Sequence, residues 1–170
     1  MAIVFHHIRY KNFLSTGNAF TELELDKSST TLIIGENGAG KSTILDALSF
    51  VLFNKPFRKV NKGQLINSIT RKELQVEVEF TIGQNRYHVI RGVKPNLFEV
   101  YMNGKLLNQS SDVRDYQEIL EKQILKINHK SFCQVVVLVK EAQVSQVRLK
   151  QREAPASRAA EYEEVGRSLH

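Results

Sequence analysis

Nine consecutive residues, 35–43, have the types and spacing needed to bind phosphate groups. They read Gly-Glu-Asn-Gly-Ala-Gly-Lys-Ser-Thr, which matches the pattern G-x-x-x-x-G-K-S. Glycines let the backbone turn around a phosphate without a Cβ in the way, and the amides exposed by that turn form a nest for an anion. Lys41 would reach the β- and γ-phosphates and act as the catalytic residue, and the hydroxyl of Ser42 would bind Mg²⁺. The residues predicted to bind the nucleotide are Asn37, Gly38, Ala39, Gly40, Lys41, Ser42 and Thr43.

The segments on either side supply the two elements that such a loop requires. The apolar run Thr31–Ile34 predicts a buried strand before the loop. Residues 44–52 place their apolar side chains at helical spacing, up to the break at Pro56. A chance glycine-rich turn is the alternative interpretation, and the order strand, loop, helix argues against it. We therefore infer that the chain binds a nucleoside triphosphate, or descends from a chain that did.

Most of the remaining patterned segments predict an antiparallel sheet. Clean alternation of apolar and polar residues after the loop favours a meander, and Asn103-Gly104 is a strong hairpin signal that Leu106-Leu107 would follow. The predicted fold class is α/β, a P-loop NTPase with an antiparallel meander next to the strand–loop–helix unit. The further expected elements are strands at 3–10, 20–25, 76–82, 87–91, 97–102 and 135–139 and a helix at 112–127.

Two pairs of titratable residues in these strands have spacings that suggest chemistry. His6 and His7 are neighbours, so strand alternation sends them to opposite faces, where they are poorly placed to share a metal. On the same alternation, Val4 and His6 are expected to share a face with Ile8 and Tyr10. Glu77 and Glu79 are spaced as a carboxylate pair for acid–base work. Both are expected on the solvent face of their strand, and simple solvation is the favoured interpretation.

Composition places the chain among soluble globular domains. It has 170 residues, enough for one domain with a core, of which 42% are hydrophobic and 25% charged. No run reaches the ~20 apolar residues of a membrane span, and the N-terminus lacks the pattern of a secretion signal. The single cysteine excludes an internal disulfide and a cysteine-rich zinc site. We expect a cytoplasmic protein with no membrane partner.

The net charge of +6 suggests a partner of opposite charge. A merely solvated basic surface and a polyanion partner such as DNA both fit this value. Basic residues gather in the polar segment after the predicted loop helix, which slightly favours the second interpretation. The residues predicted to bind DNA are Arg58, Lys59, Lys62, Arg71, Lys72 and Lys94.

An ordered set of stretches resembles a known family. Arg9–Ser15 comes first, and the phosphate loop followed by Ile44–Leu48 comes next. On these stretches the chain is similar to the N-terminal part of the SMC-like ABC-type ATPases of DNA double-strand-break repair and recombination. Within that group it most resembles the large subunit of tailed-phage recombination exonucleases, the counterpart of bacterial SbcC. The supporting stretches are Asn54–Arg58, Lys62–Ser68, Arg91–Asn96 and Ser131–Leu138.

The resemblance implies half of an ATPase head. Residues 1–138 would be the N-terminal half, and 139–170 a polar, partly helical tail. The C-terminal half would supply the signature motif and the Walker B carboxylates. Two ATP molecules with Mg²⁺ would lie between two complete heads in a homodimer, and closure on ATP would control the access of a partner nuclease subunit to DNA. The location implied is the host cytoplasm if the chain comes from a phage.

The apolar run Val135–Val139 is similar to the strand before a Walker B motif, but Lys140 stands where the aspartate of that motif would be, so we reject this interpretation. Two positions depart from the family pattern. Leu14 stands where many members carry an arginine near the nucleotide. The family's glutamine loop would complete the Mg²⁺ site, and Gln143 is the candidate, a few residues out of register.

Two further functions stay open at this point. A nucleotide-binding or interaction module without turnover is the first, because the chain has no identifiable base to position water. A small P-loop kinase is the second and fits less well, because such enzymes follow the phosphate loop with a mostly parallel sheet.

Overall fold

The computed structural model describes residues 2–27, 41–107 and 113–134. The chain divides into two units, Met1–Phe132 and Cys133–His170, and nearly all of the described residues belong to the first. The strands predicted at Thr31–Ile34 and Val135–Val139 lie outside the described residues, as do most of the phosphate loop and the tail. The domain boundary placed after residue 138 stays a prediction.

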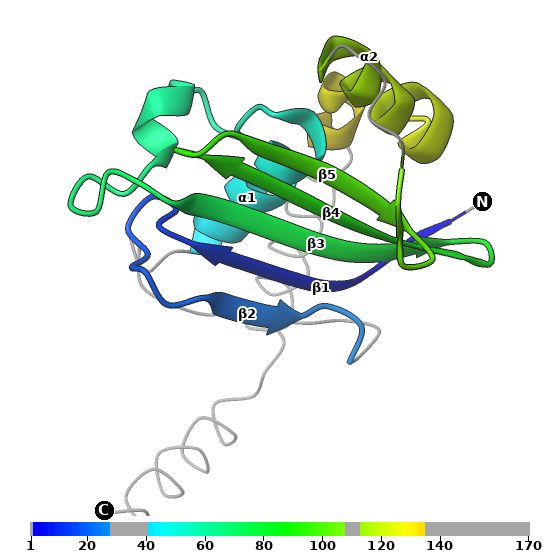
Figure 1. Cartoon of the computed structure of the whole chain (residues 1–170), viewed down its shortest axis with the longest axis horizontal. Coiled ribbons are helices and arrows are strands. Elements are labelled where there is room, and N and C mark those ends of the chain that lie inside the picture. The colour runs from blue at the N-terminus through cyan, green and yellow to red at the C-terminus, as the bar shows by residue number, and fades with distance from the viewer. Residues whose placement is uncertain (1, 28–40, 108–112, 135–170) are drawn as a thin grey trace, which may run out of the picture. The chain divides into compact units, whose positions relative to one another are not determined.

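The described residues form an antiparallel sheet of six strands in the order β2-β1-β3-β4-β5-β6 (Figure 1). This arrangement confirms the predicted meander. It also confirms the hairpin at Asn103-Gly104, where φ is 51° and 82°, the positive values that a type I′ turn requires. The strands are β1 (Ile3–Lys11), β2 (Thr21–Glu24), β3 (Leu74–Ile82), β4 (Asn85–Val93), β5 (Leu97–Met102) and β6 (Lys105–Leu106).

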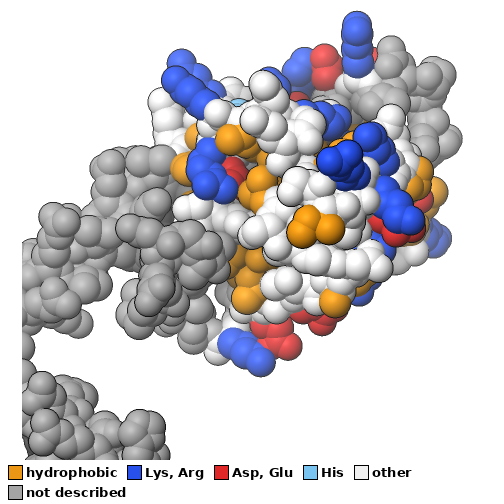
Figure 2. All heavy atoms as spheres, turned by 90° about the vertical axis from the view of Figure 1, so that its left-hand side faces the viewer, with side chains coloured by type: hydrophobic (Ala, Val, Ile, Leu, Met, Phe, Trp, Pro, Cys, Tyr) orange, Lys and Arg blue, Asp and Glu red, His pale blue; other side chains and the backbone are white. Residues whose placement is uncertain are grey.

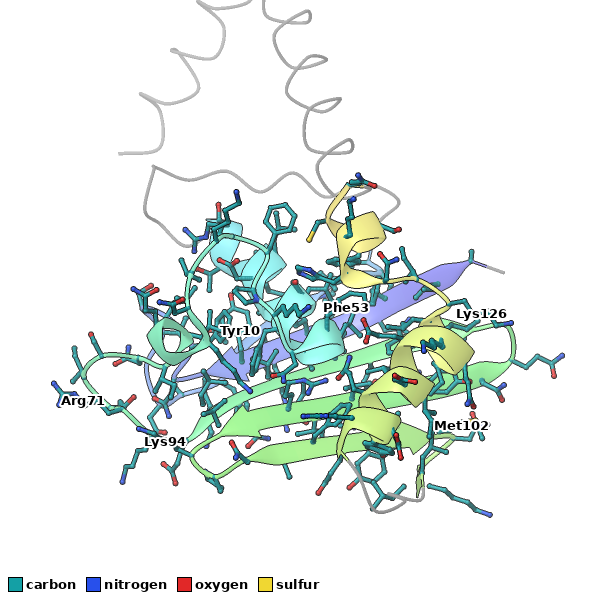
Figure 3. The ribbon with its side chains drawn as sticks, turned by 90° about the horizontal axis from the view of Figure 1, so that it is seen from above. Tyr10, Phe53, Arg71, Lys94, Met102 and Lys126 are labelled. Carbon is teal, nitrogen blue, oxygen red and sulfur yellow. The ribbon has the colours of Figure 1, made fainter. Side chains whose placement is uncertain are left out.

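Helix α1, Lys41–Phe53, packs across one face of this sheet (Figures 1 and 3). The side chains of Phe50 and Val51 are fully buried, as are the alternate residues of β3, among them Val76 and Val78. The helical spacing of residues 44–52 and the period-two pattern of β3 therefore meet in one core. The ring of Phe50 also lies 5.9 Å from that of Phe13, which joins the turn after β1 to this core.

The second predicted helix is present but changes type midway. Helix α2 runs over Val113–Glu118 and continues as the π-helical segment η2, Ile119–Leu125. Leu120 and Leu125 are five residues apart and both are buried. In a π-helix, two residues that are five apart lie more nearly on the same face of the helix than they do in an α-helix. No helix in the described ranges is long and apolar enough to cross a membrane.

A β-bulge in β1 shows that the expected facing of its first half was wrong. The ladder between β1 and β3 shifts register between Phe5 and His7, so His6 is the extra residue. Phe5 takes the core side instead, with its ring 5.8 Å from the buried ring of Phe80. Val4, which alternation placed on the core side, is 47% exposed.

The bulge also brings both imidazoles to the polar face of the sheet. Nε2 of His6 lies 2.5 Å from Oγ1 of Thr81, and its Nδ1 lies 2.6 Å from a carboxylate oxygen of Asp26. Nε2 of His7 lies 4.0 Å from a carboxylate oxygen of Glu22. The prediction of opposite faces was therefore wrong. Among the described residues, no group of three or more His, Cys, Asp or Glu could hold a metal ion.

The polar face carries a network of charged side chains around Glu77. The interpretation of this residue as merely solvated was wrong, because its side chain is only 4% exposed. Nε of Arg9 donates a hydrogen bond of 2.8 Å to one carboxylate oxygen, and Nε2 of His88 lies 3.0 Å from the other. Glu79 is more exposed and pairs with Arg86. Glu77 therefore ties β1 to β4 across the strand that lies between them.

Acid should remove the stabilisation that Glu77 provides. Burial alone would raise the pKa of this carboxyl, but hydrogen bonds from His88 and Arg9 outweigh burial and hold the pKa below its ordinary value. The unfolded chain therefore takes up the proton at a higher pH than the folded chain does. The stabilisation is fully present above the unfolded pKa of about 4.5 and is lost as the pH falls through the folded pKa.

Urea unfolding of the wild type and of Glu77→Gln tests this expectation. At pH 7 the variant should be less stable by about 1 kcal/mol, because both partners are partly exposed. This difference should shrink as the pH is lowered below 4.5. A difference that stays constant down to pH 3 would contradict the assignment.

Candidate nucleotide-binding site

Helix α1 presents three of the predicted nucleotide-binding residues in its first turn. It begins at Lys41, Ser42 is half-buried and Thr43 is 5% exposed. The first amides of a helix have no partner within the helix, and the dipole makes this end attractive to anions. The first turn contains no acidic residue that would repel a phosphate. The remaining predicted residues, Asn37, Gly38, Ala39 and Gly40, lie outside the described residues.

The other end of α1 is capped by side chains from two distant elements. Nε of Arg91, on β4, donates a hydrogen bond of 3.1 Å to the carbonyl of Val51, and Nε2 of Gln117, on α2, donates one of 2.9 Å to the carbonyl of Leu52. Nη2 of Arg91 donates to Oε1 of Gln117, and its guanidinium carbon lies 3.8 Å from the ring centre of Phe98. These contacts satisfy carbonyls in the last turn that the helix itself leaves open.

Arg91 is a buried charge, and its position explains why it is tolerated. It is 4% exposed, and burial lowers its pKa to about 9, an effect that Glu121 partly opposes. The guanidinium therefore stays charged at neutral pH, at the helix end where the dipole favours a cation. Sequence reasoning missed this residue. The available signal was its place in β4, where it follows Tyr87 and Val89 at core-facing positions.

Asp46, one turn further along α1 than Ser42, fixes the segment that follows the helix. Its side chain is fully buried, and its carboxylate accepts hydrogen bonds from the backbone amide of Arg58 at 2.9 Å and from Nε of Arg58 at 2.6 Å. This carboxylate is therefore occupied by Arg58 and is a poor candidate for a metal ligand. Ser42 stays the predicted Mg²⁺ ligand, and Gln143 lies outside the described residues.

A second set of contacts closes the turn after α1. Oγ of Ser49 donates to the carbonyl of Lys55 at 2.7 Å. Nε2 of His129 lies 3.0 Å from the same Oγ and 3.2 Å from the carbonyl of Pro56. The ring of His129 also packs edge-on to that of Phe53, 5.6 Å between centres. Together with the Asp46 pairing, these contacts give α1 a defined position against the segment after it.

Three of the predicted DNA-binding residues come together at one end of the sheet. Arg71 and Lys72 lie just before β3, Lys94 lies just after β4, and all three are exposed. The amide of Glu73 donates a hydrogen bond of 2.8 Å to the carbonyl of Lys94, which holds the two segments together. Figure 3 shows Arg71 and Lys94 at this end, away from Met102 and Lys126 at the other.

The other three predicted DNA-binding residues lie in the segment after α1. Lys59 and Lys62 are exposed, and Lys62 begins the short helix η1, Lys62–Leu65. Arg58 is half-exposed, but its guanidinium is engaged by Asp46. Figure 2, which faces this end of the molecule, shows Lys and Arg side chains spread over it, with hydrophobic side chains between them.

Comparisons with known proteins place the chain near DNA-processing ATPases. It matches the family model described as an AAA domain over residues 7–165. It is 47% identical over 133 residues to exonuclease subunit 2 of Enterobacteria phage T4, across 78% of this chain and 24% of that protein. It is 28% identical over 139 residues to the DNA double-strand break repair Rad50 ATPase of Sulfolobus acidocaldarius, across 80% of this chain and 15% of that protein. The chain thus spans about a quarter of the length of these relatives or less.

A solved structure supports the predicted fold. The Smc head domain of Pyrococcus furiosus, with an extended coiled coil and bound to the C-terminal domain of ScpA, superposes with a TM-score of 0.54 at 25% identity. The superposition covers 71% of this chain and 33% of that one. With the family match, it confirms the predicted α/β fold of the P-loop NTPase class.

Proposed function

From the premise that the chain belongs to the AAA domain family, as the N-terminal half of an SMC-like ABC-type ATPase head, we propose that it binds ATP with Mg²⁺ and serves in DNA repair or recombination. Helix α1 is the observation that carries this proposal. Lys41, Ser42 and Thr43 stand in its first turn, which holds no acidic residue. Contacts from Arg91, Gln117 and His129 support the opposite end of the helix and the turn that follows it.

The chain's own residues would bind and orient the triphosphate. The amides of residues 37–40 would cradle the phosphates, and Lys41 would place its charge against the β- and γ-phosphates. Ser42 would offer its hydroxyl to the metal, with Gln143 as a second ligand. When bound, Mg²⁺ would neutralise charge on the β- and γ-oxygens. Preorganised positive groups of this kind supply much of the catalysis of phosphoryl transfer.

Hydrolysis would require groups from outside this chain. The C-terminal half of the head would supply the signature motif and the Walker B carboxylates, and two complete heads would close on two ATP molecules. Closure would regulate a partner nuclease subunit at DNA ends. The exposed basic residues Lys59, Lys62, Arg71, Lys72 and Lys94, and less directly Arg58, would bind DNA phosphates.

A nucleotide-binding module without turnover is the second candidate function. It is favoured by one observation: Asp46, a carboxylate of α1 just beyond the predicted site, is occupied by Arg58 and so is not free to position water. On this alternative the chain would bind ATP and change its contacts with partners, but would not complete a hydrolytic site with any other chain.

Steady-state ATP hydrolysis tests the proposal and separates it from the alternative. The purified chain alone should show no turnover above that of the Lys41→Ala variant. Addition of the C-terminal half of the head as a separate polypeptide should produce turnover that depends on Lys41. Lys41-dependent turnover by the chain alone would overturn the half-head proposal. ATP binding with no turnover in the presence of the C-terminal half would favour the module.

A further inference from the structure

The loop before β3 exposes a large apolar side chain to an unusual degree. Ile69 is 88% exposed, compared with 47% for Val4 and 50% for Leu106. It belongs to residues 67–73, which we call the tip loop. The tip loop lies at the end of the sheet where β3 begins (Figure 1). A single exposed isoleucine is ordinary on a protein surface, so the surroundings of Ile69 must decide whether this one has a role.

Hydrogen bonds from one buried side chain fix the tip loop. Asn67 is 6% exposed, and its Oδ1 accepts from the amides of Ile69 at 2.8 Å and Thr70 at 3.1 Å. Its Nδ2 donates to the carbonyl of Thr16 at 3.0 Å, and its amide donates to the carbonyl of Asn12 at 2.9 Å. Asn67 therefore anchors the tip loop to the turn after β1. Ile69 is held outward by a defined structure, so its exposure is not that of a frayed segment.

The backbone of the tip loop adopts conformations that cost free energy. Arg71 has φ of 55° and Glu73 has φ of 52°, values in the left-handed region that residues other than glycine rarely adopt. Hydrogen bonds hold Arg71 there: its amide donates to the carbonyl of Asn67, and its Nε donates to the carbonyl of Ser68. Such strained residues persist only where surrounding structure imposes them, and they gather at functional sites.

The charge around Ile69 favours a polyanion as the partner. Arg71 and Lys72 are exposed within the tip loop, and Lys94 is placed beside it by the hydrogen bond from the amide of Glu73. Glu73 is the one acidic residue of the tip loop. Three cations against one carboxylate would attract nucleic acid phosphates, and by the same charge they would attract an acidic protein surface. The apolar side chain between the cations favours nucleic acid. Apolar side chains flanked by cations are used by DNA-binding proteins to contact base surfaces between phosphate contacts.

We propose that the tip loop is a DNA contact in which Ile69 packs against base surface while Arg71, Lys72 and Lys94 bind the flanking phosphates. This inference rests on the DNA-related function proposed above and adds to it a non-electrostatic contact. The two parts of the contact have different signatures. Loss of a phosphate contact lowers the salt dependence of binding by about one unit of slope in log Kd against log salt. Loss of an apolar contact weakens binding and leaves that slope unchanged.

Fluorescence anisotropy of the full chain with a labelled 30-base-pair duplex, titrated at several salt concentrations, tests the proposal. Ile69→Ser should weaken binding about tenfold with an unchanged salt slope, because burial of an isoleucine is worth a factor of this order. Arg71→Gln should weaken binding and lower the slope by about one. Leu106→Ser is the matched control, since Leu106 is also exposed, follows a lysine and lies at the other end of the sheet. It should bind as the wild type does.

Each other outcome overturns the proposal in a distinguishable way. If Arg71→Gln lowers the slope and Ile69→Ser changes nothing, the tip loop binds phosphate alone. If neither substitution matters although the wild type binds, DNA lies elsewhere and a protein partner is the better occupant of the tip loop. If the wild type itself binds no DNA at low salt, the proposed DNA function fails as well. Thermal unfolding checks that Ile69→Ser folds as the wild type does, which its exposure leads us to expect.

Discussion

Replacing Lys41 with alanine should weaken ATP binding by the chain about 100-fold. The lysine is the one side chain of the predicted loop that carries a positive charge to the phosphates, and removal of one partner of a close charge pair costs about 2–5 kcal/mol. Lys41 begins α1, so the amides of the first turn would remain in place and would retain part of the affinity. Titration of a fluorescent ATP analogue, or the shift in Tm that ATP produces, measures the loss.

Lys55→Ala is the control for this prediction. Lys55 is an exposed lysine shortly after the other end of α1, and its substitution removes the same charge from the chain. The control should bind ATP as the wild type does. Equal affinities of Lys41→Ala and the wild type would mean that residues 35–43 do not bind the nucleotide. Equal losses in Lys41→Ala and Lys55→Ala would mean that net charge, and not a phosphate contact, determines affinity.

Replacing Arg91 with leucine should lower the free energy of unfolding by about 3 kcal/mol. Leucine fills much of the space but leaves the buried carbonyl of Val51 without its donor, at a cost of about 1–3 kcal/mol. The half-buried side-chain oxygen of Gln117 also loses its donor, at a smaller cost. The contact between the guanidinium and the ring of Phe98 is lost as well. Part of this cost is offset, because burial of the wild-type charge is itself unfavourable.

Two further arginine substitutions separate the causes. Arg86→Leu changes an arginine on the same strand that is 61% exposed, and it should cost less than about 1 kcal/mol. Arg91→Lys keeps the charge at the helix end but loses the planar fork, so its stability should lie between the wild type and Arg91→Leu. Urea unfolding monitored by circular dichroism gives the three values. An Arg91→Leu loss no larger than that of Arg86→Leu would contradict the capping role.

Local patterns in the sequence predicted most of the described fold. The alternation through Val76, Val78 and Phe80 identified β3, and Asn103-Gly104 identified the hairpin between β5 and β6. Both signals are local: the first depends on the period of a strand and the second on which residues accept positive φ. Helix α1 was also predicted from a local signal, the helical spacing of the apolar residues in 44–52.

The errors arose where a distant partner decides the conformation. The bulge at His6 is visible only in the register between β1 and β3, and no pattern within β1 reveals it. Glu77 occupies a polar position in the alternating pattern of β3, and its burial depends on Arg9 and His88 from two other strands. The helix-capping role of Arg91 likewise depends on a distant partner, the carbonyl of Val51 on α1. At the candidate site, the motif predicts Lys41 and its neighbours as nucleotide ligands, and this stays a prediction. The side chains that support the helix come from α2 and β4, which sequence spacing could not bring together.

The order of strands in the sheet also determines when the parts of this chain can associate during synthesis. β1 is made first, but it pairs with β3 over separations from 64 residues, between Lys11 and Gln75, to 79 residues, between Ile3 and Ile82. Short turns join β3 to β4 and β4 to β5, so β4 can pair with β3, and β5 with β4, as soon as each is made. Helix α1 precedes all three, and among the described elements it packs mainly against β3 and β4. The helix that begins at Lys41 therefore leaves the ribosome before the strands that it packs against have been made.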